Sequence, residues 1–151
     1  MTVWDAWCDG SAIPNPGRMG LGAVLVAPDG SRHAMSRSPA GDGGCNNEAE
    51  LRAVTMALEE AKTRGATVVR VHCDNSIVVT QLAGASGKTG SSTQPIVRLA
   101  DLFDAARSVV AGFERVELVW IPRIRNAEAD RLARAALGAA PKQRKAKHLR
   151  R

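Results

Sequence analysis

The chain has 151 residues, of which 44% are hydrophobic, and a formal net charge of +6. This length predicts one domain with a sizeable core. Because the sequence opens with no leader pattern and contains no apolar run of membrane-spanning length, we expect a cytoplasmic protein with no membrane partner. The three cysteines lack metal-ligand spacing, which favours thiols over a zinc site or a disulfide, and Cys8 and Cys73 lie in apolar runs and are expected to be buried.

The excess positive charge lies at the end of the sequence. Residues 142–151 contain six Lys and Arg and no acid, and the remainder carries 15 basic against 15 acidic residues. We therefore predict a folded domain over residues 1–140 and a basic tail over residues 141–151. Such a tail is suited to contacting a polyanion, but it can equally serve only to keep the protein in solution.

The first part of the chain predicts three antiparallel strands. An apolar run at residues 3–9 is followed by a Gly/Ser/Pro-rich turn at residues 10–20, and further strands are expected at residues 21–27 and 32–37. Residues 38–44 read as a loop.

The rest of the chain alternates helices and strands. We expect a helix from Asn46 or Asn47 to Gly65, a strand at 67–74 and a short helix at 75–83. A flexible segment at 84–93 leads to a helix at 95–111. A strand at 115–121, with Trp120 in the core, and a last helix from Asn126 to Gly138 complete the prediction. A strand–helix–strand path predicts a right-handed parallel crossover. The fold class is therefore α/β, with a five-stranded mixed sheet of three antiparallel strands followed by parallel strands, flanked by helices.

Two of the predicted strands end on an aspartate. Asp9 follows the first strand and Asp74 follows the fourth. If these strands are parallel neighbours, both carboxylates emerge at the carboxyl edge of the sheet, where open α/β sheets bind ligands. Burying such groups is costly unless cations or hydrogen-bond donors accompany them.

Two further acids lie near the starts of helices. Glu50 shares a helix line with Val54 and Ala57 and so points toward the sheet, whereas Glu48 faces water with Arg52 as its i+4 partner. A capping box with Asn47 explains Glu50 equally well. Asp130 lies beside the apolar line of the last helix, where it could join the other acids or complement the helix dipole.

Together, the four acids predict a cation site. Four converging carboxylates repel one another unless cations are bound. Oxygen-only ligands suit Mg²⁺ or Mn²⁺, and a pair of such ions about 3.5–4 Å apart supports phosphoryl transfer.

The motifs around these acids resemble type 1 ribonuclease H. The resemblance rests on Cys8-Asp9-Gly10-Ser11 with Asn15-Pro16-Gly17 and Gly20-Leu21-Gly22-Ala23, on Asn46-Asn47-Glu48-Ala49-Glu50-Leu51, on Cys73-Asp74-Asn75, and on Asn126-Ala127-Glu128-Ala129-Asp130-Arg131-Leu132-Ala133. Order and spacing match over about residues 2–138.

The resemblance implies a metal-dependent endonuclease that hydrolyses the RNA strand of RNA–DNA hybrids, leaving 5′-phosphate and 3′-hydroxyl ends. It places two Mg²⁺ or Mn²⁺ ions on the catalytic acids Asp9, Glu50, Asp74 and Asp130. It also implies substrate contacts, including ribose 2′-hydroxyls, at Gly10, Ser11, Asn15, Asn46 and Asn47. Turn formation by Asn15 and helix capping by Asn46 or Asn47 are the structural alternatives.

The sequence departs from the family in two places. Residues 122–126 contain no histidine, although many family members carry one there. The chain thus resembles compact members that also lack a basic helical handle. Arg123 or Arg125 is a candidate phosphate contact in place of the histidine. Gly43, Gly44 and Cys45 replace the usual DNA-side groups, which predicts weaker discrimination against double-stranded RNA.

Other functions stay open. The chain could be a hybrid- or RNA-binding module of the same fold with weak or relaxed nuclease activity, another nuclease of the superfamily, or a structural partner domain. We expect a monomer.

Overall fold

The computed structural model describes residues 2–83 and 99–138. The flexible segment predicted at 84–93, the beginning of the helix predicted at 95–111, and the basic tail lie outside these ranges.

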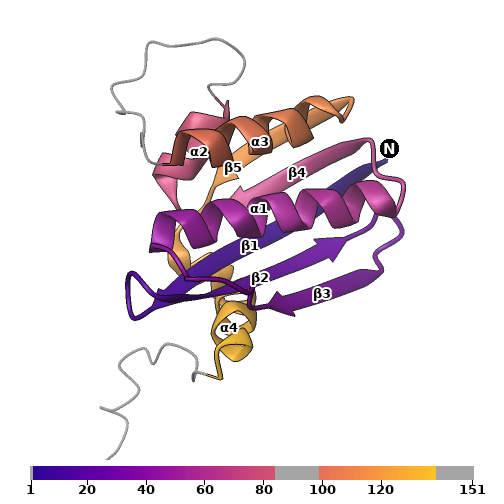
Figure 1. Cartoon of the computed structure of the whole chain (residues 1–151). Coiled ribbons are helices and arrows are strands. Elements are labelled where there is room, and N and C mark those ends of the chain that lie inside the picture. The colour runs from indigo at the N-terminus through magenta and orange to yellow at the C-terminus, as the bar shows by residue number, and fades with distance from the viewer. Residues whose placement is uncertain (1, 84–98, 139–151) are drawn as a thin grey trace, which may run out of the picture.

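A five-stranded sheet forms the centre of the molecule, with the strand order β3-β2-β1-β4-β5 (Figure 1). β1 pairs antiparallel with β2, and β2 with β3, while β1 pairs parallel with β4, and β4 with β5. This confirms the predicted α/β fold and its mixed sheet. The strands are β1 Val3–Ile13, β2 Arg18–Val26, β3 Arg32–Arg37, β4 Val68–Cys73 and β5 Arg115–Trp120.

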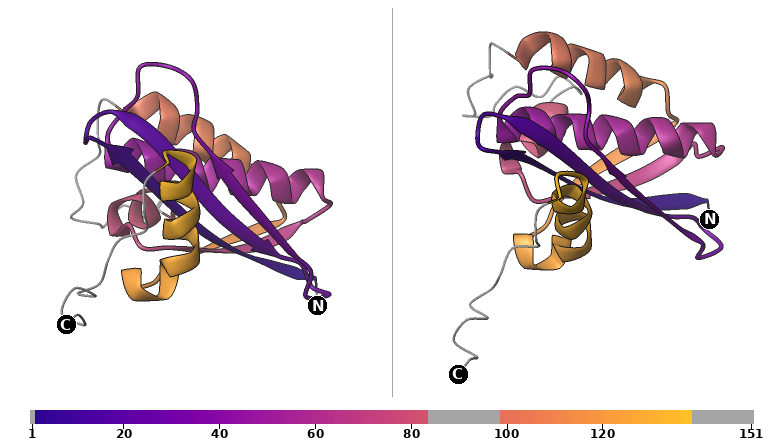
Figure 2. Two further views of the ribbon diagram at one scale, coloured as in Figure 1. Left: turned by 90° about the horizontal axis from the view of Figure 1, so that it is seen from below. Right: turned by 60° about the horizontal axis from the view of Figure 1, so that its bottom comes forward.

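Helices cover both faces of the sheet. α1, α2 and α3 lie on one face, and α4 packs on the opposite face against β1, β2 and β3 (Figure 2). The helices are α1 Asn46–Thr63, α2 Ser76–Ala83, α3 Ala100–Ala111 and α4 Ala127–Ala136, the last preceded by a short 3-10 helix, Arg123–Asn126. The core under α1 includes Cys8 and Cys73, both buried free thiols as predicted.

β1 is longer than the sequence predicted. Residues 10–13 were expected in a turn, but they continue the antiparallel ladder with β2, from the pair Gly10↔Leu21 to the pair Ile13↔Arg18. Gly10 and Ser11 were wrongly predicted as turn residues. They lie instead in a strand on which helices pack closely, where small side chains are required.

Glycines let the helices contact the sheet backbone. A Cβ atom on Gly10 would lie 2.2 Å from the carbonyl carbon of Ala49 in α1. On the other face, Cβ atoms on Gly20 and Gly22 would lie 2.1 Å and 2.3 Å from carbonyl oxygens of α4. Because both helices approach this closely, residues on either face can reach β1.

The prediction that Trp120 belongs to the core is wrong. Trp120 is 53% exposed, because it is the last residue of an edge strand. The indole Nε1 donates a hydrogen bond to the carbonyl oxygen of Asp74 at 3.2 Å.

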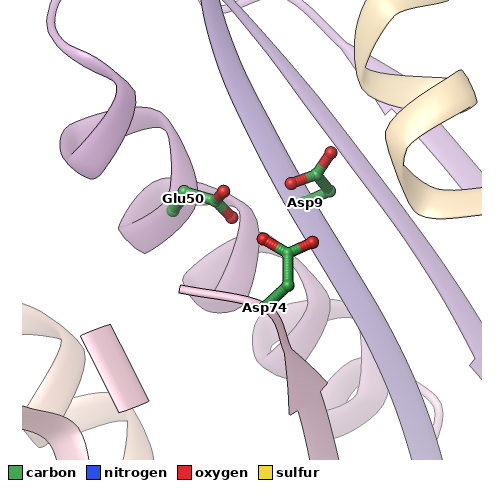
Figure 3. A group of neighbouring side chains, drawn as sticks. All are labelled: Asp9, Glu50 and Asp74. Atoms are coloured by element: carbon green, nitrogen blue, oxygen red, sulfur yellow. The ribbon is translucent and has the colours of Figure 1, made fainter. Parts of the chain in front are cut away.

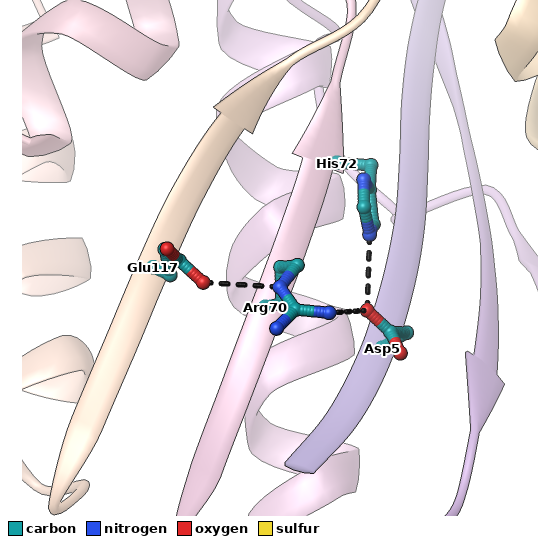
Figure 4. Close-up of polar contacts among 4 residues, drawn as sticks. All are labelled: Asp5, Arg70, His72 and Glu117. Atoms are coloured by element: carbon teal, nitrogen blue, oxygen red, sulfur yellow. Dashed lines mark hydrogen bonds and ion pairs between the residues drawn. The ribbon is translucent and has the colours of Figure 1, made fainter.

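The sheet face that carries α4 has a polar network over β1, β4 and β5. Arg70 contacts Asp5 at 3.3 Å and Glu117 at 3.0 Å, and His72 Nε2 lies 3.1 Å from Asp5 Oδ1 (Figure 4). The His72 ring stacks on Trp7 with ring centroids 4.5 Å apart. This network pairs the charges of the three strands with one another.

Within residues 2–83 and 99–138, the structure contains no helix with the length and apolar character needed to cross a bilayer.

Candidate active site

The site lies where β4 ends beside β1. The last parallel pair is Cys8↔Cys73, so Asp9 and Asp74 follow it side by side. The predicted proximity of these two acids is therefore correct, although Asp9 lies within β1 rather than at its end. Beyond this point β1 has no parallel neighbour among the described strands. That gap allows side chains from both faces of the sheet to converge.

Glu50 enters the site from α1. It belongs to the buried line that also contains Val54, Ala57 and Ala61, as the helix pattern predicted, and only 6% of it is exposed. Its Oε1 accepts a hydrogen bond from the backbone N–H of Gly10 at 3.2 Å. The alternative capping box with Asn47 is not formed, because Cys45 occupies the N-cap position.

Glu48 takes the predicted ion pair with Arg52 at 2.8 Å. Its side chain is only 15% exposed because it lies over Gly44, so the prediction that Glu48 faces water is wrong.

The carboxylates of Asp9, Glu50 and Asp74 point toward one another (Figure 3). One oxygen from each lies within 4.8 Å of the other two, a spacing that allows the three groups to hold a metal ion. Every potential ligand in this cluster is an oxygen, as hard divalent cations require.

Asp130 reaches the same pocket from α4, on the opposite face of the sheet. Its carboxylate lies close enough to Asp9 to affect the pKa of that residue through hydrogen bonding and charge. It also forms an ion pair with Arg134, with Nε and Oδ1 3.4 Å apart, and both side chains are largely buried. Arg134 was not predicted as a site residue, because a basic residue four positions after an acid is common on exposed helix faces.

The acids line a cavity of about 360 Å³. Besides the four carboxylates, its walls include the predicted substrate contacts Gly10, Ser11, Asn46, Asn47 and Arg123, together with Asn75 and Arg134. Arg125 lies instead in a separate hollow beside Trp7. Asn15 lies outside the cavity wall, but its Oδ1 accepts a hydrogen bond from the backbone N–H of Asn46 at 3.1 Å.

Burial and mutual repulsion raise the pKa values of the two innermost acids. Burial raises the pKa of Asp9 to about 7, and the charge of Asp74 adds to this rise. Burial also raises the pKa of Glu50 well above its usual value, with the charge of Asp9 as the next cause. A bound cation would stabilise the ionised forms, so the cluster fits a divalent metal.

Asn126 is a site residue that sequence reasoning missed. It was predicted as a helix cap and does precede α4, but its side chain makes no cap hydrogen bond. The buried Nδ2 donates instead to the carbonyl oxygen of Cys8 at 2.8 Å and to Asp74 Oδ2 at 2.9 Å. Asn126 thus fixes one carboxylate against β1. An asparagine before a helix is so common a cap that only the structure shows this role.

Comparisons with known proteins agree with this geometry. A family model described as "Reverse transcriptase-like" matches residues 7–136. A Mycobacterium tuberculosis protein named "Bifunctional protein Rv2228c" is 35% identical over 132 residues, which are 87% of this chain and 35% of that protein. The chain therefore spans about a third of this relative's length.

Two solved structures share the fold. The crystal structure of RNase H1 from the archaeon Halobacterium salinarum matches with a TM-score of 0.79 and 31% identity, covering 90% of this chain and 98% of that one. LC11-RNase H1, solved in complex with an RNA/DNA hybrid, matches with a TM-score of 0.73 and 27% identity, covering 91% and 97%. With its family match, its fold and its acidic cluster, the chain belongs to the ribonuclease H family.

Proposed function

We propose that this protein is an endonuclease that hydrolyses the RNA strand of RNA–DNA hybrids. The observation that carries the proposal is the cluster of Asp9, Glu50 and Asp74, with Asp130 in the same cavity. The hybrid bound to the similar LC11-RNase H1 supports the choice of substrate. We further propose that the protein acts as a monomer and discriminates less strictly against double-stranded RNA than many family members.

The four acids are proposed to hold two divalent ions, Mg²⁺ or Mn²⁺. Such ions would activate the attacking water and neutralise charge on the phosphate and the departing oxygen, yielding 5′-phosphate and 3′-hydroxyl ends. The chain's own residues hold the ligands in place. The N–H of Gly10 orients Glu50, and Asn126 orients Asp74.

A substrate panel tests the proposal. Wild-type protein is incubated with an RNA–DNA hybrid, double-stranded RNA and single-stranded DNA, with Mg²⁺, Mn²⁺ or EDTA. We expect metal-dependent cleavage of the hybrid's RNA strand, slower cleavage of double-stranded RNA, and none of single-stranded DNA. Binding of the hybrid without cleavage in either metal would identify a binding module instead.

Arg123 and Arg125 form a matched pair for testing phosphate contact. Both are exposed arginines on the same short 3-10 helix, but only Arg123 lines the acidic cavity. We expect Arg123→Ala to raise KM about tenfold, as the loss of one charge-assisted hydrogen bond predicts, and Arg125→Ala to leave KM within twofold. Steady-state kinetics on the hybrid measures both. Equal effects of the two substitutions would contradict a specific contact by Arg123.

The basic tail is proposed to add non-specific attraction to a folded domain that ends near residue 140. Removing residues 141–151 takes away six positive charges and no negative ones. We expect a higher KM, a shallower dependence of KM on salt, and nearly unchanged kcat, because phosphate contacts release counterions. Kinetics over a salt series measures this. The idea fails if both proteins respond alike to salt.

Stability should depend on pH and on metal together. Since the folded-state pKa values of Asp9 and Glu50 are raised, the folded metal-free protein holds protons that the unfolded chain releases. Their contribution to stability is therefore fully present at low pH and is lost as pH rises through their raised pKa values, about 7 for Asp9. We expect Mg²⁺ to raise the Tm clearly at about pH 8 and little at about pH 5. Thermal unfolding with Mg²⁺ or EDTA measures the difference, and an equal rise at both pH values would contradict it.

A further inference from the structure

A chain of hydrogen bonds connects the start of α2 to Asn47 in the cavity. Asn75 precedes α2, and its Oδ1 accepts hydrogen bonds from the backbone N–H groups of Ile77 at 2.9 Å and Val78 at 3.1 Å. The Nδ2 of Asn75 donates to Asn47 Oδ1 at 2.7 Å. Asn75 therefore caps α2 and contacts α1 with the two ends of one amide group.

These hydrogen bonds fix the orientation of the side-chain amides of Asn75 and Asn47. Oxygen and nitrogen of an asparagine are assigned from their partners, and a backbone N–H can only donate. The side of Asn75 that faces Ile77 and Val78 must therefore be its oxygen. The nitrogen of Asn75 then faces Asn47, so the Asn47 oxygen must accept the hydrogen bond between them. With its oxygen held by Asn75, Asn47 keeps an NH₂ group for which the described residues offer no acceptor.

The amide oxygen of Asn46 is also engaged within the protein, but by a backbone group. Its Oδ1 accepts a hydrogen bond from the backbone N–H of Ala12 at 2.8 Å. Both residues line the cavity, and in each the amide oxygen is already engaged while the contacts within the described part of the chain leave the NH₂ group without an acceptor. The orientation of Asn46 depends on backbone alone, whereas that of Asn47 depends on the side chain at position 75.

We propose that Asn75 is a positioning residue that makes Asn47 a hydrogen-bond donor to the nucleic acid. The inference rests on the proposed function, since it assigns the hybrid to this cavity. Donors of this kind match acceptors of the minor groove, namely purine N3, pyrimidine O2 and the oxygen of a ribose 2′-hydroxyl. Without Asn75, the Asn47 amide is free to turn its oxygen toward these acceptors and repel them.

Two substitutions separate this role from helix capping. Serine at position 75 can still cap α2 but is too short to reach Asn47, whereas alanine loses both contacts. We expect Asn75→Ser to raise KM for the hybrid about three- to tenfold, with kcat within twofold and Tm unchanged. Asn75→Ala should raise KM equally and also lower the Tm.

A double-mutant cycle with Asn47 completes the test. Asn47→Ala alone should raise KM, and adding Asn75→Ser to it should raise KM no further. The inference is overturned if Asn75→Ser leaves KM at the wild-type value, if it raises KM equally with and without Asn47, or if Asn47→Ala has no effect. If wild-type protein neither binds nor cleaves the hybrid, the proposed function fails as well, and that outcome is distinct from the others.

Discussion

Replacing Asp9 by asparagine is expected to reduce the rate of hybrid cleavage about a thousandfold. The carboxylate belongs to the cluster with Glu50 on α1 and Asp74 after β4, and it lies close to Asp130 on α4. Asparagine keeps the size of the side chain but removes the negative charge that a divalent cation needs. A loss of this size corresponds to about 4 kcal/mol of transition-state stabilisation, within the several kcal/mol that a metal site supplies.

The same substitution should stabilise the metal-free protein. Burial and the charge of Asp74 raise the pKa of Asp9 to about 7, which shows that the folded state disfavours its ionised form. Above that pH the neutral asparagine avoids this cost. In EDTA we therefore expect the free energy of unfolding, measured with urea, to rise by an amount on the order of a few kcal/mol. Activity and stability therefore move in opposite directions, which misfolding of the variant cannot produce.

Asp104→Asn is the matched control. Asp104 is an exposed acid on α3 whose ion pair with Arg107 lies within its own helix. We expect both its activity and its stability to stay close to wild type, because exposed helix pairs contribute little. Near-normal cleavage by Asp9→Asn in Mg²⁺ would refute the proposed role of the cluster, and so would an equal loss in the control.

The sequence predicted the fold well because its periodic elements are strong. The buried line of α1 and the strand–helix–strand path determined which strands pair in parallel and on which side Glu50 lies. The errors fall where a residue has two common uses. Gly10 and Gly20 were predicted in a turn and Gly22 simply in a strand, whereas all three allow close helix packing on two faces of the sheet.

The asparagines show the same limit of local sequence patterns. Asn46, Asn47 and Asn126 all occur where helix caps are expected, and none of their side chains caps the helix that follows. Each instead contacts a segment far away in the sequence, at Ala12, Asn75 and Cys8 respectively. Long-range partners of this kind depend on the assembled fold. For this reason the proximity of Asp9, Glu50 and Asp74 was predictable from the strand and helix patterns, while the long-range partners of the asparagines were not.

Gly10→Ala tests whether Gly10 serves packing or substrate contact, and we expect a large effect on both stability and activity. The new Cβ would lie 2.2 Å from the backbone of Ala49 and 2.6 Å from the nitrogen of Glu50. Since backbone atoms cannot rotate away, α1 must move off β1, which costs about 1–3 kcal/mol. That movement would also separate Glu50 from Asp9.

Gly112→Ala provides the comparison, measured by urea unfolding and hybrid cleavage. A Cβ there would approach the flexible end of Lys62 at 2.8 Å and no backbone atom closer than 3.4 Å, so little loss is expected. If Gly10 instead mattered only as a substrate contact, Gly10→Ala would raise KM without changing the urea midpoint. A combined loss of stability and kcat would show that the close approach of α1 to β1 is what holds Glu50 within reach of the other acids.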